Sequence, residues 1–167
     1  MPLTPHYQLY IAAYNALTQG VTEPRGEVGQ MCHHMVFDLL ERAGLVSMER
    51  ISALSRTFTS EELARRFLAR EFMDVQLDGA QLVEAVNSQS VILCLYKPAP
   101  GQHPAHSLVS MGYDNVAGFN NTGSTGLAGG LNQNLHHFSK FPWHYINMDH
   151  VTVWGASPGA VAERIMS

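Results

Sequence analysis

The sequence predicts an α+β fold in which N-terminal helices pack on an antiparallel β-sheet. Apolar residues recur at helical spacing through the first half of the chain, and short apolar runs between turn residues follow from residue 90 onward. Helices followed by strands, rather than strict alternation of the two, is the order typical of α+β proteins. With 167 residues and 46% hydrophobic content, the chain suits one domain covering residues 1–167.

Two long helices are predicted near the N-terminus. In residues 4–20, tyrosine and aliphatic side chains recur every three or four positions, and Gly20 ends the pattern. In residues 30–46, Cys32 and the apolar residues after it share one helical face, and Gly44 ends the helix. Cys32 therefore sits at the start of a helix.

Two further helices are predicted before the sheet. The stretch 58–72 opens with Thr59 and Glu62, the spacing of a capping box. The stretch 78–89 is shorter and has Asp78 in the N-cap position.

The second half of the chain predicts strands and one last helix. Apolar runs bounded by turn residues indicate strands at 90–97, 105–114, 115–121 and 150–155. The Gly-rich segment 122–134 has no packing signal and is interpreted as a flexible loop. The terminal helix is expected after Ser157 as N-cap, with Pro158 in the first helical position.

Charge and hydropathy exclude several functional classes. The net charge is −4 and no basic run is present, so the sequence does not favour a nucleic-acid partner. No apolar stretch approaches the roughly 20 residues of a membrane span. The first residues lack a basic region followed by an apolar core, so we expect a cytoplasmic protein or one exported by a route other than Sec.

The two cysteines have different surroundings in the sequence. Cys94 lies inside an apolar strand and is expected to be a buried core thiol. Cys32 opens a helix, where the helix dipole places roughly half a positive charge that stabilises a thiolate. Cys32 is therefore the candidate nucleophile.

A nucleophilic cysteine needs a base, and the base needs an orienting group. His106 opens a predicted strand directly after a loop rich in proline and glycine. The next strand ends at Asn120 and Asn121, and an antiparallel pairing can return that end to the start of the preceding strand. Either asparagine can then fix the tautomer of the imidazole.

A cysteine opening a helix, a histidine opening a strand and an asparagine closing the next strand resemble the papain-like cysteine peptidases. The run "AHSLVSMGYD" followed by "GFNNTG" is most similar to small bacterial effector or toxin peptidases. The resemblance implies a papain-like fold with Cys32 as nucleophile, His106 as general base and Asn121, or its rival Asn120, as orienting residue. It also implies Gln30 for the oxyanion hole.

The resemblance implies hydrolysis of an amide bond in a protein or peptide substrate, with no cofactor. The same triad performs deamidation or transglutamination when the attacked amide belongs to glutamine. From a different class, the chain can be a catalytically silent module that binds a protein partner.

A metal site is not favoured by the histidine spacing. Cys32, His33 and His34 are successive on one helix, whereas a helix presents ligands on one face at intervals of three or four residues. His33 and His34 are expected on a solvated helix face, and the distant His136 and His137 at a polar loop edge.

Overall fold

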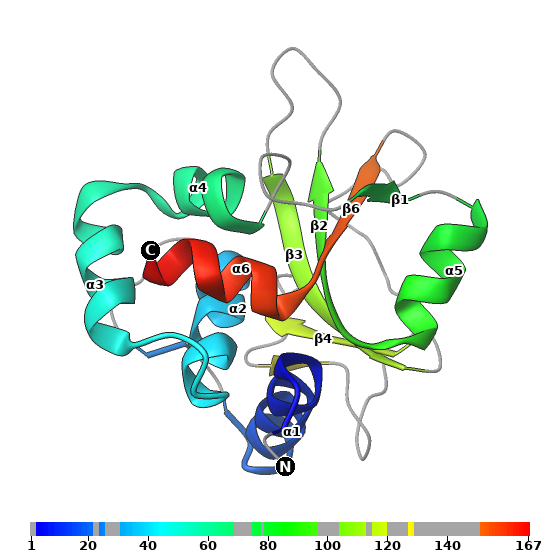
Figure 1. Cartoon of the computed structure of the whole chain (residues 1–167), viewed down its shortest axis with the longest axis horizontal. Helices are drawn as coiled ribbons and strands as arrows, with labels where there is room; N and C mark the ends of the chain where they lie inside the picture. The colour runs from blue at the N-terminus through cyan, green and yellow to red at the C-terminus, as the bar shows by residue number, and fades with distance from the viewer. Residues whose placement is uncertain are drawn as a thin grey trace.

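The computed structural model confirms the α+β class: an antiparallel sheet carries helices on both faces (Figure 1). The structure describes residues 3–21, 24–25, 31–68, 75–77, 79–96, 104–112, 115–119, 127–128 and 151–167. None of the helices in this part of the chain combines the length and the hydropathy of a membrane-spanning segment.

The described strands form one sheet in the order β1-β6-β2-β3-β4-β5, with every neighbouring pair antiparallel. β2, β3 and β4 follow one another as the predicted meander, while the late strand β6 adds to the other side of β2. The bounds are β1 Val75–Leu77, β2 Gln89–Tyr96, β3 Pro104–Gly112, β4 Asn115–Phe119, β5 Leu127–Ala128 and β6 Thr152–Ala156.

The helices divide between the two faces of the sheet. In Figure 1, α5 lies on one side, and the remaining helices gather on the other. The bounds are α1 Pro5–Thr18, α2 Met31–Arg42, α3 Met48–Thr57, α4 Ser60–Leu63 with the π-helical turn η1 Ala64–Leu68, α5 Gly79–Asn87 and α6 Pro158–Met166.

Strand alternation builds a separate apolar cluster on each face. Ile92 and Val109 point toward α1 and α2 and join the larger cluster. Leu93 and Leu108, the next residues on the same strands, pack with Val86 of α5. Because both faces are covered, residues 92–96 of β2 and 106–112 of β3 are all buried instead of alternating between buried and exposed.

Local sequence signals located most helix ends correctly. Gly20 and Gly44 both adopt positive φ after α1 and α2, as their predicted helix-ending role requires. Thr59 and Glu62 form the capping box of α4, and the Ser157 side chain accepts from the Ala160 N–H at the start of α6. Asp78 lies outside the described residues.

Three elements were not predicted. α3 is largely polar and buries only Ile51 and Leu54, so its apolar period is weak. The strands β1 and β5 have three and two residues, too few to show a pattern, and β5 interrupts the segment that we expected to be entirely loop.

The buried face of α1 consists of small side chains. Leu9, Ala12, Ala13 and Ala16 are buried, whereas Tyr7 is exposed and Tyr10 stacks on Tyr14 at the edge of the core. The small alanine side chains allow α1 to pack against α2. The periodicity of the tyrosines therefore predicts the helix correctly but does not predict which of its faces is buried.

Candidate functional site

Cys32 is the second residue of α2, at the helix start where the sequence places it. Its side chain is buried, with 1% of the residue exposed. The N–H groups in the first turn of an α-helix have no acceptor within that helix, so this turn offers backbone donors next to the thiol.

His106 is the third residue of β3 and is fully buried. Burial lowers the pKa of His106 to about 3, and the neighbouring His33 adds a smaller effect in the same direction. The imidazole is therefore neutral at pH 7, the state in which a histidine accepts a proton.

Ser107, the residue after His106, connects β3 to the first turn of α2. Its Oγ donates to the backbone carbonyl of Cys32 at 3.2 Å and lies 3.0 Å from Nδ1 of His33. A hydroxyl has a single proton, so Nδ1–H of His33 is the donor to Ser107 when Ser107 donates to Cys32. Three buried groups are thus joined in one hydrogen-bonded chain.

The strand register places His106 and Ser107 on opposite faces of the sheet. Ser107 stands opposite Cys94 and faces α2, whereas His106 stands opposite Leu95 and shares the face of Leu108. The structure therefore brings the backbone segments of Cys32 and His106 together. The side chain that points at α2, however, belongs to Ser107 and not to His106.

His33 and His34 are buried, so the expectation of a solvated helix face was wrong. Every residue from Cys32 to Leu40 is buried, because α2 lies between the sheet and other helices. Burial lowers the pKa of His33 to about 4, and His34 acts in the same direction. Sequence alone does not predict this burial, because a polar residue buried on a central helix has the same pattern as one on a solvated face.

Cys94 is a fully buried core thiol, as predicted. Burial is the main cause that raises its pKa, and the nearby Cys32 raises it further. Beside it, Tyr96 contacts Trp154 edge to face with ring centroids 6.5 Å apart. Cys94 therefore lies near Cys32 but is held in its thiol form.

The other predicted site residues lie outside the described part of the chain. These are Gln30, Asn120, Asn121, His136 and His137. Among the residues that are described, no three His, Cys, Asp or Glu side chains group together as metal ligands do.

No family model matches this chain, and no curated protein or solved structure is significantly similar to it. The fold and the candidate site define an α+β protein with a buried cysteine at the start of α2. Ser107 of β3, the strand that carries His106, hydrogen-bonds to the backbone carbonyl of that cysteine.

Proposed function

We propose that this protein is a thiol-dependent amide hydrolase of papain-like type, with Cys32 as its nucleophile. The observation that carries the proposal is the Ser107 hydrogen bond to the Cys32 carbonyl. It holds the cysteine-bearing turn of α2 against the strand segment that carries His106. A helix start and a strand start are also the elements on which the papain-like pattern carries its cysteine and its histidine.

In the proposed reaction, Sγ of Cys32 attacks the amide carbonyl carbon while its proton passes to the imidazole of His106. The carbonyl oxygen becomes an oxyanion, for which the backbone N–H of Cys32 is a donor at the helix start. His106 then gives the proton to the departing amine, leaving a thioester that water hydrolyses. Gln30 and Asn121 keep their proposed roles as second oxyanion donor and orienting residue.

The burial of His106 affects the first step of this reaction, the transfer of the thiol proton. A base with a pKa near 3 accepts a thiol proton poorly, because a general base works best when its pKa lies near the working pH. Substrate binding that hydrates His106 or places it beside the thiolate raises that pKa. The register also turns the His106 side chain toward the face of α5, away from Cys32. We therefore propose that this structure is a resting state and that the start of β3 rearranges before His106 takes the thiol proton.

A second candidate function is supported by the same burial. Cys32 and His106 are 1% and 0% exposed, and the register directs His106 toward the face of α5. A protein whose thiol and imidazole serve only packing shows this arrangement too, and it would act as a binding module without catalysis.

Thiol labelling combined with product analysis separates the two functions. The parent protein, Cys32→Ala and Cys94→Ala are incubated with a mixture of peptides, and new termini and released ammonia are measured by mass spectrometry and an ammonia assay. We expect products from the parent and Cys94→Ala but not from Cys32→Ala. Iodoacetamide should label Cys32 and spare Cys94, whose raised pKa suppresses the thiolate.

Equal product release by the parent and Cys32→Ala, or labelling of Cys94 before Cys32 in the folded protein, contradicts the proposal. His106→Gln and His33→Gln identify the base, since only the residue that takes the thiol proton should slow labelling of Cys32 when it is replaced. Ammonia without new termini would indicate that the attacked amide is a glutamine side chain.

A further inference from the structure

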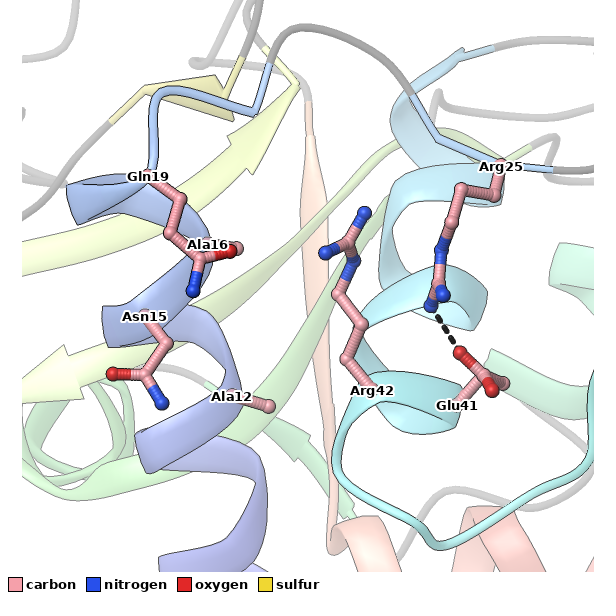
Figure 2. A pocket seen from close by; sticks show the side chains of 7 residues that line it. All are labelled: Ala12, Asn15, Ala16, Gln19, Arg25, Glu41 and Arg42. Carbon is pink, nitrogen blue, oxygen red and sulfur yellow. Dashed lines mark hydrogen bonds and ion pairs between the residues drawn. The ribbon is translucent and has the colours of Figure 1, made fainter.

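A pocket of about 360 Å³ lies between α1 and α2, at the opposite end of α2 from Cys32 (Figure 2). Cys32 and Arg42 are ten residues apart, which corresponds to about 15 Å along the helix axis. The pocket volume is at the lower end of the roughly 300–1,000 Å³ found for ligand sites. The pocket is therefore a site distinct from the candidate site at Cys32.

The floor and one wall of the pocket come from α1. Ala12 and Ala16 contribute small side chains that leave the space open, and Gln19 extends its carboxamide toward the gap in Figure 2. Asn15, one turn before Gln19, supplies a second carboxamide at the rim. Neither carboxamide has a hydrogen-bond partner within the part of the chain that the structure describes.

The facing wall is charged and rests on the buried Asp38. Nε of Arg25 and Nε of Arg42 each donate at 2.8 Å to a different oxygen of the Asp38 carboxylate. A terminal nitrogen of Arg25 also pairs with Glu41 (Figure 2). Both carboxylates are thus engaged by guanidinium groups, so neither presents an unpaired negative charge to the pocket.

Arg42 is the group left with unused donors. Its Nε is committed to Asp38, whereas its two terminal nitrogens have no acceptor among the described residues and project into the space between α1 and Arg25 (Figure 2). Two terminal nitrogens in one plane match the two oxygens of a carboxylate. The Arg42 side chain is only 22% exposed and its Nε is fixed by Asp38, so the fork is held in place before a ligand arrives.

We propose that this pocket binds the carboxylate of a small organic acid. The terminal nitrogens of Arg42 receive the carboxylate in bidentate fashion, and the amide of Gln19 bonds to the neighbouring polar group of the ligand. Two arginines and two carboxylates make the cluster neutral overall, so it favours a singly charged carboxylate over a phosphate dianion, which requires excess positive charge.

N-acetylglycine is a suitable probe because it combines one carboxylate with one amide. Titration of the ¹⁵N-labelled protein, followed through the Arg42 Nε–H and Gln19 side-chain signals, should give saturable shifts with a millimolar Kd. N-acetylglycinamide has the same shape without the charge and should give no saturable shift. Inorganic phosphate should bind at least tenfold more weakly than N-acetylglycine.

Two variants test the geometry. Gln19→Glu is nearly isosteric and lies at the exposed C-cap position after α1, yet its carboxylate competes for Arg42 and should weaken binding at least tenfold. Arg42→Lys keeps a positive charge for Asp38 but lacks the fork, and should weaken binding similarly. The matched control is Asn87→Asp, an equal charge change at an exposed position of α5 across the sheet, which should bind as the parent does.

Melting curves identify any variant that does not fold, and Gln19→Glu alone suffices for the test if Arg42→Lys unfolds. The proposal is overturned if N-acetylglycine and its amide shift the signals equally, if phosphate binds more tightly, or if folded Gln19→Glu binds with parental affinity.

Discussion

At the residue scale, Ser107 is the side chain that positions the candidate site. The sequence pattern directs attention to His106, because histidine is the usual base in thiol chemistry. The hydrogen bonds to α2 instead come from Ser107, through the Cys32 carbonyl and His33 Nδ1. In a strand, adjacent residues face opposite ways, so a one-residue difference decides which side chain meets the helix.

Ser107→Ala should destabilise the protein and change the reactivity of Cys32. It removes the Ser107 hydrogen bonds of the Cys32 carbonyl and of the buried His33 imidazole, at about 1–3 kcal/mol of unfolding free energy. Urea unfolding measures this loss, and iodoacetamide labelling should show a changed Cys32 rate because the first turn of α2 loses its tie to β3.

Ser110→Ala is the matched control on the same strand. Ser110 Oγ donates to the Ser88 carbonyl at 2.8 Å, so its removal also weakens folding but should not alter the labelling of Cys32. Equal labelling rates in Ser107→Ala and the parent would show that the Ser107 bonds do not position the thiol.

The buried histidines should make stability fall in mild acid. The folded-state pKa values of about 4 for His33 and about 3 for His106 lie below the unfolded value near 6.5. Between these values the unfolded chain binds more protons, so the stability present above pH 6.5 is lost as the pH falls toward 4 and 3. The slope approaches about 1.4 kcal/mol per pH unit for each histidine.

Urea unfolding at pH 7.5, 6.0 and 5.0 measures this slope. His106→Leu removes one of the two titrating groups and should reduce the slope by about half. A parent protein whose unfolding free energy does not change between pH 7.5 and 5.0 would contradict the buried, neutral state of both rings.

At the element scale, α2 is the central helix of the structure. Its residues from Cys32 to Leu40 are all buried, including His33, His34 and Asp38. The sequence shows an amphipathic pattern because polar residues alternate with the apolar ones along the helix. Neighbouring elements supply partners to two of them: Ser107 bonds to Nδ1 of His33, and two arginines bond to Asp38.

α4 depends on its N-terminal cap because it is only four residues long before η1 begins. Thr59 Oγ1 accepts from the Glu62 N–H at 3.2 Å, and Glu62 accepts from the Thr59 N–H at 2.8 Å. Thr59→Ala removes half of this box and should lower the unfolding free energy by about 0.5–2 kcal/mol. Chemical denaturation provides the measurement.

Thr57→Ala is the control for α4. Thr57 lies two residues earlier and bonds only to a carbonyl of its own helix, at Ala53, so we expect a change within about 0.5 kcal/mol. If the two variants lose equal stability, the effect belongs to the loss of threonine and not to the cap.

At the scale of the whole molecule, two sets of buried polar interactions connect segments that are far apart in the sequence. The Ser107 chain joins β3 to α2, and Asp38 joins α2 to the segment at Arg25 that follows α1. Arg50 similarly links α3 to the carbonyls of Ile165 and Ser167 at the end of α6. These polar links hold the helical face of the structure together around its apolar core.

Asp38→Asn should cost much more than Glu41→Gln, although both carboxylates pair with Arg25. Asp38 is 1% exposed and its replacement leaves the guanidinium of Arg42 without a counter-charge, which we expect to cost about 3 kcal/mol. Glu41 is partly exposed, and its single pair is worth about 0–1 kcal/mol. Equal melting temperatures in the two variants would contradict this assignment.

The amino-acid sequence by itself determined the α+β class, the ends of α1 and α2, the capping box of α4, the cap of α6 and the burial of Cys94. Each of these follows from local chemistry: a glycine with positive φ, a side chain that accepts from a nearby N–H, or an apolar run of strand length. The positions of Cys32 at a helix start and His106 at a strand start were predicted on the same basis.

Only the tertiary structure decided which of these residues meet. The face of β3 that carries Ser107 turns toward α2 because the register with β2 places it opposite Cys94, and register depends on pairing between segments far apart in sequence. The burial of His33 and Asp38 likewise depends on elements that pack over α2 from elsewhere in the chain. The sequence shows that a residue is polar, but the tertiary structure determines which group forms a hydrogen bond or ion pair with it.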